Sequence, residues 1–101
     1  MKQHLIYCGL MANNGLSEEE TRKLVNDLAM VHFPNGHTIH EAVGRWAGVM
    51  VQCNENTMIV EVWEMAGFDA PPLARFIKAY KEQAAQESVV LLTREVEALV
   101  C

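Results

Sequence analysis

Two helices with sharp ends alternate with strand-like segments, and this order limits the possible folds more than any other feature of the sequence. Ser17 and Glu20 form a capping-box pattern that begins the first helix, and Pro34-Asn35-Gly36 ends it. The second helix is predicted from about Leu73 to Ala84, because prolines precede it and apolar residues recur at helical spacing. The strand-like segments are residues 5–11, 38–52, 57–65 and 88–100.

This order predicts a ferredoxin-like α+β fold of the βαββαβ type, with an antiparallel four-stranded sheet and both helices on one face. The chain has 101 residues, half of them hydrophobic, and is predicted to form one domain over residues 1–101. Residues 53–56 (Cys-Asn-Glu-Asn) are predicted as the hairpin loop between the middle strands. In the strand that follows, alternation turns Met58, Val60 and Val62 toward the helices.

The second face of the predicted sheet has no helix to cover it, and the sequence supplies apolar and charged residues for it. The same alternation places Ile59, Glu61, Trp63 and Met65 together on this face. Neighbouring strands add further charged residues if the register allows. These are Glu41, Arg45 and Arg94. The face is interpreted either as an interface between two stacked sheets or as a platform for a ligand. The surplus of hydrophobic residues favours a homodimer or larger homo-oligomer.

If the chain binds a ligand, we expect aromatic and ionic side chains on this face to form the site. An indole offers a flat stacking surface, and arginine recognises carboxylate or phosphate with fixed geometry. Together these groups suit a small anionic or nucleotide-like ligand. The expected residues are Arg45, Trp46, Glu61, Trp63 and Arg94, with His37 and Tyr7 as secondary candidates.

No motif in the sequence identifies a reaction, a metal or a cofactor. His37 and His40 precede Glu41, but residues three apart on a strand point to opposite faces, so the two imidazoles do not converge on one ion. The sequence has neither a phosphate-binding glycine loop nor a nucleophile elbow. We therefore expect no metal, no cofactor and no catalytic residue, although His37 is a possible general base because histidine as a residue type titrates near neutrality.

Charge and cysteine content limit the kinds of partner and the cellular compartment that we expect for this chain. Thirteen acidic and eight basic residues give a net charge of −5, which argues against nucleic-acid binding because phosphate contacts need a basic face. Cys8, Cys53 and Cys101 form no CxxC pattern and are expected to be free thiols in a reducing cytoplasm. The apolar run near the start is too short for a signal peptide or a membrane span, so no membrane partner is expected.

Three segments, in this order, resemble an uncharacterised family of small bacterial proteins with F-P-x-G-x-T, G-x-W and Q-E-S-V motifs. The segments are residues 33–38 (Phe-Pro-Asn-Gly-His-Thr), 44–46 (Gly-Arg-Trp), and Tyr80 followed by 86–90 (Gln-Glu-Ser-Val-Val). The resemblance covers nearly the whole chain and implies the fold, but it brings no activity with it. Many members look exported or lipid-anchored, whereas this chain is expected to have no leader.

The order of elements is also similar to that of the dimeric α+β-barrel proteins. The preferred interpretation is a small cytoplasmic, non-enzymatic binding domain that self-associates through its sheet. It would sequester a small ligand or inhibit a partner protein, as short phage- or mobile-element-encoded inhibitors of host defence do. The alternative is a cofactor-independent isomerase or monooxygenase of the α+β-barrel kind. An enzyme needs a buried titratable group in a cleft, whereas a binding domain needs only shape and polar anchors.

Overall fold

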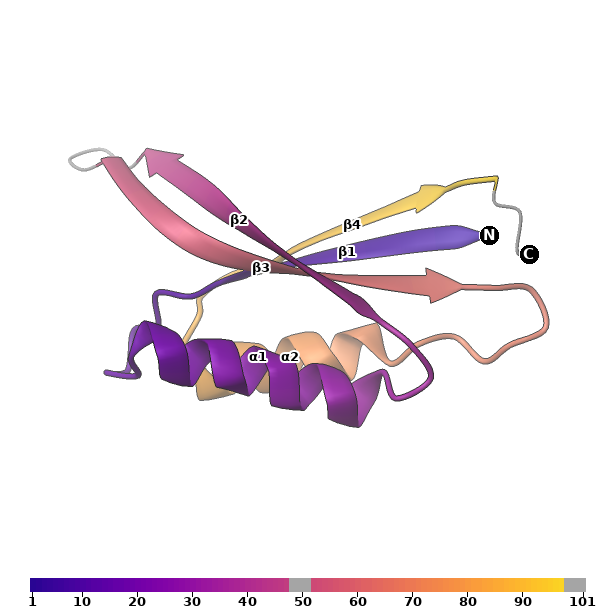
Figure 1. Cartoon of the computed structure of the whole chain (residues 1–101), viewed down its shortest axis with the longest axis horizontal. Helices are drawn as coiled ribbons and strands as arrows, with labels where there is room; N and C mark the ends of the chain where they lie inside the picture. The colour runs from indigo at the N-terminus through magenta and orange to yellow at the C-terminus, as the bar shows by residue number, and fades with distance from the viewer. Residues whose placement is uncertain (48–51, 98–101) are drawn as a thin grey trace.

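The computed structural model describes residues 1–47 and 52–97, with the backbone alone at residues 46, 47, 52 and 53. The elements are β1 (Lys2–Gly9), α1 (Glu18–His32), β2 (Thr38–Ala47), β3 (Gln52–Glu64), α2 (Leu73–Gln83) and β4 (Val90–Glu95). The four strands form one antiparallel sheet in the order β2-β3-β1-β4, and both helices lie against one face of it (Figure 1). The predicted ferredoxin-like α+β fold is confirmed.

The strand ends differ from the sequence prediction. β3 already begins at Gln52, so the prediction of a hairpin loop at residues 53–56 is wrong. Pairing of β2 with β3 continues to Ala47 and Gln52, and the connection between these strands lies outside the described residues. Asparagine is a poor strand former, but strand propensity depends strongly on context, and here a long antiparallel partner is present.

The ends of α1 follow the local signals in the sequence. The Ser17 hydroxyl accepts a hydrogen bond from the Glu20 backbone N–H at 3.1 Å, and the Glu20 carboxylate accepts one from the Ser17 N–H at 3.2 Å. Beyond the helix, Gly36 has a φ of 142°, which a residue with a Cβ rarely adopts. The capping box and the glycine turn therefore bound the helix as expected.

The core lies between the helices and the two central strands. Met58, Val60 and Val62 face the helices as predicted, and each is at most 3% exposed. Val31 of α1, three residues after the buried Leu28, lies on the outer side of the helix and is 72% exposed. The helices bury other residues against the sheet: Thr21, Val25, Leu28 and Ala29 from α1, and Phe76 and Tyr80 from α2.

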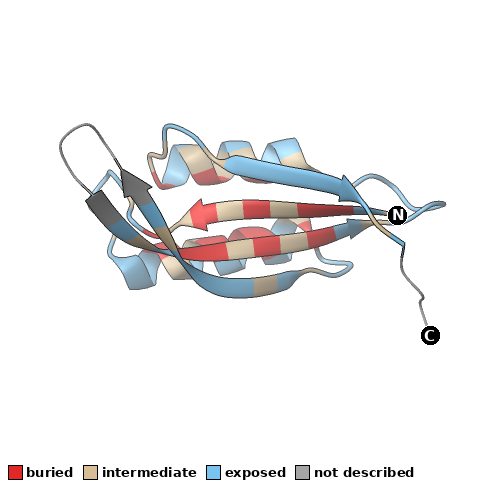
Figure 2. Ribbon diagram, turned by 90° about the horizontal axis from the view of Figure 1, so that it is seen from above, coloured by how far each residue is buried: buried red, intermediate tan, exposed pale blue. Residues whose placement is uncertain are grey.

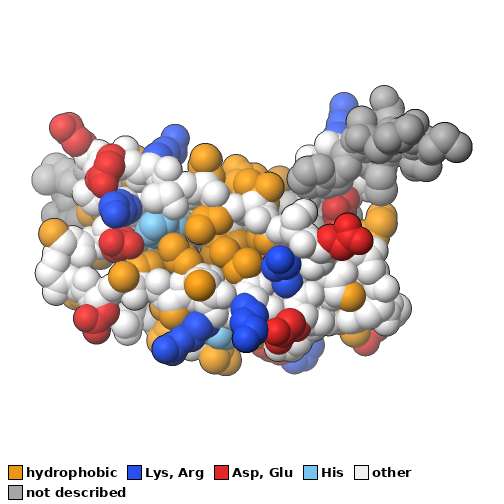
Figure 3. Space-filling model, turned by 180° about the vertical axis from the view of Figure 1, so that it is seen from behind, with side chains coloured by type: hydrophobic (Ala, Val, Ile, Leu, Met, Phe, Trp, Pro, Cys, Tyr) orange, Lys and Arg blue, Asp and Glu red, His pale blue; other side chains and the backbone are white. Residues whose placement is uncertain are grey.

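The outer strands take little part in this core. Buried residues concentrate in β1 and β3, whereas β2 and β4 are largely exposed along their length (Figure 2). From behind, the surface over α2 and β4 gathers hydrophobic side chains with Lys and Arg side chains below them (Figure 3). Within residues 1–47 and 52–97, the outer edges of β2 and β4 and the sheet face opposite the helices are therefore uncovered.

Candidate functional site

The sheet face opposite the helices, called here the helix-free face, collects several of the residues predicted for a site. Residues directly opposite one another on antiparallel strands share a face, so the register assigns each side chain to one side of the sheet. The helix-free face carries Gln3, Leu5 and Tyr7 of β1, Thr38 and His40 of β2, Ile59, Glu61 and Trp63 of β3, and Val90, Leu92 and Arg94 of β4.

Four of the predicted residues, Tyr7, Glu61, Trp63 and Arg94, therefore share this face. Gln3 lies between two of them, because it pairs with Trp63 on one side and with Arg94 on the other. The Arg94 guanidinium donates a hydrogen bond to the Gln3 side-chain oxygen at 2.5 Å. The indole, the carboxylate and the guanidinium thus surround one short stretch of β1.

The other predicted residues do not join this group. Arg45 pairs with Asn54 and falls on the opposite side of the sheet, because it lies an odd number of residues from Thr38. Glu41 lies on the same side as Arg45, and its carboxylate accepts a hydrogen bond from Arg22 of α1 at 2.7 Å. The expectation that Arg45 and Glu41 belong to the helix-free face is wrong.

The remaining two predicted residues lie at the ends of β2. Nδ1 of His37 is 3.0 Å from the Phe33 carbonyl oxygen, so its ring helps to close the end of α1. The backbone of Trp46 pairs with Cys53 near the last described pair of the hairpin, but its side chain lies outside the described part of the structure.

The carboxylate on the helix-free face has a close imidazole partner. Nε2 of His40 lies 2.7 Å from Oε1 of Glu61. This hydrogen bond, with smaller contributions from Gln3 and Trp63, holds the pKa of Glu61 below its ordinary value, against an opposing effect of partial burial. Glu61 is thus an ionised anchor beside an indole.

The His40–Glu61 pair predicts a measurable response to acid. A carboxylate whose pKa is lowered in the folded state stabilises the fold above its ordinary pKa of 4.5, and this contribution disappears as the pH falls through the lower folded value. Glu61→Gln is expected to lose about 0.2–1 kcal/mol at pH 7 and to flatten the stability profile below pH 4.5. Urea unfolding from pH 7 to pH 3 measures both, with Glu82→Gln on α2 as control. Identical acid profiles for the wild type and Glu61→Gln would contradict the pairing.

A second imidazole, which the sequence did not single out, is buried on the helix side. His4 is 4% exposed; its Nδ1 lies 2.8 Å from Thr93 Oγ1 and its Nε2 3.0 Å from Glu64 Oε1. The three side chains connect β1, β3 and β4 through polar contacts. Alternation with Ile6 and Cys8 in β1 was the sequence signal that His4 faces inward.

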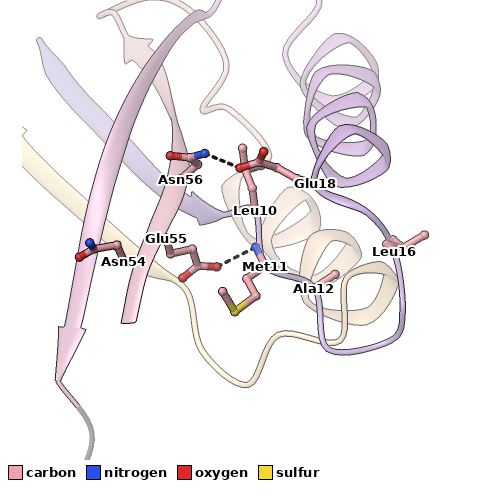
Figure 4. A pocket seen from close by; sticks show the side chains of 8 residues that line it. All are labelled: Leu10, Met11, Ala12, Leu16, Glu18, Asn54, Glu55 and Asn56. Atoms are coloured by element: carbon pink, nitrogen blue, oxygen red, sulfur yellow. Dashed lines mark hydrogen bonds between the residues drawn. The ribbon is translucent and has the colours of Figure 1, made fainter. Parts of the chain in front are cut away.

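A cavity of about 270 Å³ lies where β1 ends and α1 begins (Figure 4). Glu55 accepts a hydrogen bond from the Met11 N–H at 2.8 Å, and Asn56 donates one to Glu18 at 2.5 Å. The lining therefore combines two carboxylates and two amides with apolar groups. The lining residues are Leu10, Met11, Ala12, Leu16, Glu18, Asn54, Glu55 and Asn56. The sequence missed this cavity because residues 53–56 were predicted as a loop.

The chain makes room for Glu55 at the end of β1. A Cβ on Gly9 would collide with the Glu55 carboxylate, so glycine permits that side chain to lie across the strand. Beneath it, the Tyr80 hydroxyl donates a hydrogen bond to the Gly9 carbonyl oxygen. Burial raises the pKa of Tyr80, which keeps the hydroxyl protonated as a donor.

Metal and membrane sites are not indicated by the described residues. Within residues 1–47 and 52–97, no three His, Cys, Asp or Glu side chains are grouped so that they could hold a metal ion. Neither α1 nor α2, the helices in the described part of the chain, has the length and apolar character needed to cross a bilayer.

Comparison with known proteins gives two kinds of likeness. A phage SAM lyase in its apo state shares the fold over 92% of this chain and 78% of its own, with a TM-score of 0.64 and 16% identity. A phage SAM lyase in complex with S-methyl-5'-thioadenosine covers 93% of this chain and 80% of its own, with a TM-score of 0.57 and 15% identity. At this identity the likeness shows the fold alone. No curated protein matches the sequence.

The family comparison is more direct, because it spans nearly the whole chain. The sequence resemblance implied membership of a family without known function, and the matching family model agrees with it in this respect. Residues 3–99 match the family model described as "Protein of unknown function (DUF3574)", and this chain belongs to that family.

Proposed function

We propose that this chain is a binding protein that associates with copies of itself through the helix-free face and binds a small adenosine-containing ligand. The observation that carries the proposal is the composition of this face. Leu5, Tyr7, Ile59, Val90 and Leu92 form an apolar strip across three strands, and Glu61 and Arg94 border it at the Gln3 end of β1.

The strip is too exposed to be explained by the chain alone. Within the strip, Val90 is 51% exposed and Leu92 45%, and Trp63 beyond its Gln3 end is 38% exposed. Small monomeric proteins seldom leave such apolar side chains together in water. Glu61 on β3 and Arg94 on β4 lie on opposite sides of β1. A second copy that meets this face can bring its guanidinium toward the carboxylate of the first, because the face carries charges of both signs.

The likeness to the phage SAM lyase that holds S-methyl-5'-thioadenosine supports an adenosine-containing ligand. The charges of this chain select among such ligands. Glu18 and Glu55 line the cavity with carboxylates, and on the helix-free face Glu61 stands against the single guanidinium of Arg94, which already donates to Gln3. This balance of charge disfavours a phosphate-bearing nucleotide. A neutral thioether such as S-methyl-5'-thioadenosine, or the sulfonium of SAM, fits these surroundings better than the anionic ligand expected from the sequence.

Two measurements test the proposal. Light scattering at micromolar concentration is expected to give at least twice the 11.3 kDa chain mass, and Leu92→Arg is expected to reduce it to one chain. Phe68→Arg, at an exposed loop position, is the matched control and keeps the assembly. Calorimetric titration is expected to show saturable binding of S-methyl-5'-thioadenosine or SAM and none of ATP. A wild type that stays monomeric removes the interface, and absence of binding by either compound removes the ligand.

The enzymatic alternative has one specific observation in its favour. The His40 imidazole and the Glu61 carboxylate, 2.7 Å apart, can hold and move a proton on the face proposed to meet a ligand. If the protein is an enzyme, incubation with SAM consumes it, and His40→Asn abolishes the reaction while leaving the binding of S-methyl-5'-thioadenosine intact. Binding without turnover would identify a binding protein.

A further inference from the structure

The two outer strands of the sheet expose apolar side chains at unpaired edges. All six residues of β4 are exposed, including Val90, Leu91 and Leu92, and Val43 of β2 is 63% exposed. Within the described residues, β4 pairs only with β1 and β2 only with β3. Such edges offer backbone donors and acceptors to another strand, and proteins normally cover or charge them.

The surface beside β4, called here the β4 edge, is an apolar groove with a basic border. A cavity of about 600 Å³ lies between α2 and the helix side of β4. Lys78 and Lys81 border it and form no ion pair with another described residue, and the gathering of hydrophobic side chains beside basic ones is visible in Figure 3. The lining residues are Leu73, Ala74, Ile77, Lys78, Lys81, Glu82 and Leu91.

The surface beside β2, called here the β2 edge, has matching properties of opposite charge. The register turns Ile39, Glu41 and Val43 of β2 toward the helix side, in the order apolar, acidic, apolar. Arg22 of α1 contacts both Glu19, at 2.5 Å, and Glu41, at 2.7 Å, so a single cation serves two carboxylates.

Helical spacing extends the β2 edge along α1. Met30 lies two four-residue steps after Arg22 and therefore on the same side of the helix, and it is 65% exposed. The β2 edge thus offers apolar groups from a strand and a helix together with an excess of carboxylate, whereas the β4 edge offers an apolar groove with an excess of lysine.

We propose that the β4 edge of one copy joins the β2 edge of the next copy, so that the sheet continues from chain to chain. This inference rests on the proposed self-association and specifies its geometry. Val43 would lie against Leu91 and the α2 groove, and Glu41 would lie near the lysines.

Pairing of like edges is disfavoured by the same charges. Two β4 edges would bring the lysines of both copies together, and two β2 edges would bring their carboxylates together. Contact between unlike edges is heterologous, and such a contact closes into a ring when the rotation between copies allows it. A ring of this kind would gather the helix-free faces around its axis and cover both the edges and the apolar strip.

Two single-edge variants test this geometry. Leu91→Glu places a carboxylate against Glu41 of the neighbouring copy. Val43→Lys places a cation against Lys78 and Lys81 of the neighbouring copy on the other side. Each variant alone is expected to run at the 11.3 kDa mass of one chain in light scattering. Each retains one intact edge, so an equimolar mixture is expected to recover at least twice that mass.

The matched control and the contrary outcomes separate this inference from the proposed function. Phe68→Arg is expected to keep the wild-type mass. Both edge variants are expected to fold, because Val43 and Leu91 are exposed, and circular dichroism checks this. The edge-to-edge geometry is overturned if Val43→Lys assembles like the wild type or if the mixture stays monomeric. If the wild type assembles and Leu92→Arg dissociates it while the mixture fails, self-association stands and only this geometry falls.

Discussion

Phe76→Ala is expected to lower the free energy of unfolding by about 3–5 kcal/mol. Phe76 is fully buried on α2, and its ring centroid lies 5.2 Å from that of Phe33 and 6.0 Å from that of His32, both at the end of α1. Removing the ring leaves a cavity where the two helices meet and deletes two aromatic contacts. A domain of this kind has a total stability of about 5–15 kcal/mol, so the variant is expected to be marginal.

Urea unfolding followed by tryptophan fluorescence measures this loss. Phe68→Ala is the matched control, because it makes the same change at a side chain that is 74% exposed, and little change is expected. If Phe76→Ala does not fold, Phe76→Leu keeps the test open, with an expected loss of about 1–2 kcal/mol. Equal stability of the Phe76 and Phe68 variants would show that α2 does not pack on α1 as described.

The Cys8 thiol is expected to react about 10³-fold more slowly than an ordinary cysteine in the folded protein. Cys8 is fully buried on the helix side of β1, and this burial raises its pKa from 9.0 to about 12. Three pKa units reduce the reactive thiolate by about 10³-fold, and steric protection slows the reaction further.

The measurement is the rate of labelling with a disulfide reagent at pH 8. Cys53→Ser and Cys101→Ser leave Cys8 as the sole thiol, and the same variant in concentrated urea gives the reference rate. Similar rates in folded and unfolded protein would place Cys8 at the surface and contradict the alternation of β1 on which the core depends.

Both predictions concern the side of the sheet that is covered, and they bear on the proposed function indirectly. A well-packed helix side implies that the exposed apolar residues Trp63, Val90 and Leu92 are not remnants of a loose core. Their exposure then agrees with the partner or ligand that we propose for the helix-free face. For the helix-free face, the corresponding expected result is that Leu92→Arg loses assembly without losing stability.

The order of elements, the ends of α1 and the inward face of β3 were determined by the sequence itself. Each depends on interactions between neighbours in the chain. The side chains of Ser17 and Glu20, three residues apart, each accept a hydrogen bond from the backbone N–H of the other. Gly36 has a backbone conformation that other residues avoid. Met58, Val60 and Val62 alternate within one strand, so the sequence alone shows that they share a side.

Only the tertiary structure decided which residues of different strands meet. Alternation gives the parity of side chains within one strand, but the register between strands depends on pairing across long sequence separations. Pairing of Thr38 with Glu61 turned Arg45 and Glu41 away from Trp63. Pairing along β2 also made a strand of residues 53–56, although their composition favours a turn. The contacts of His4 with Glu64 and Thr93 likewise exist only because β1 lies between β3 and β4, an adjacency that no local pattern encodes.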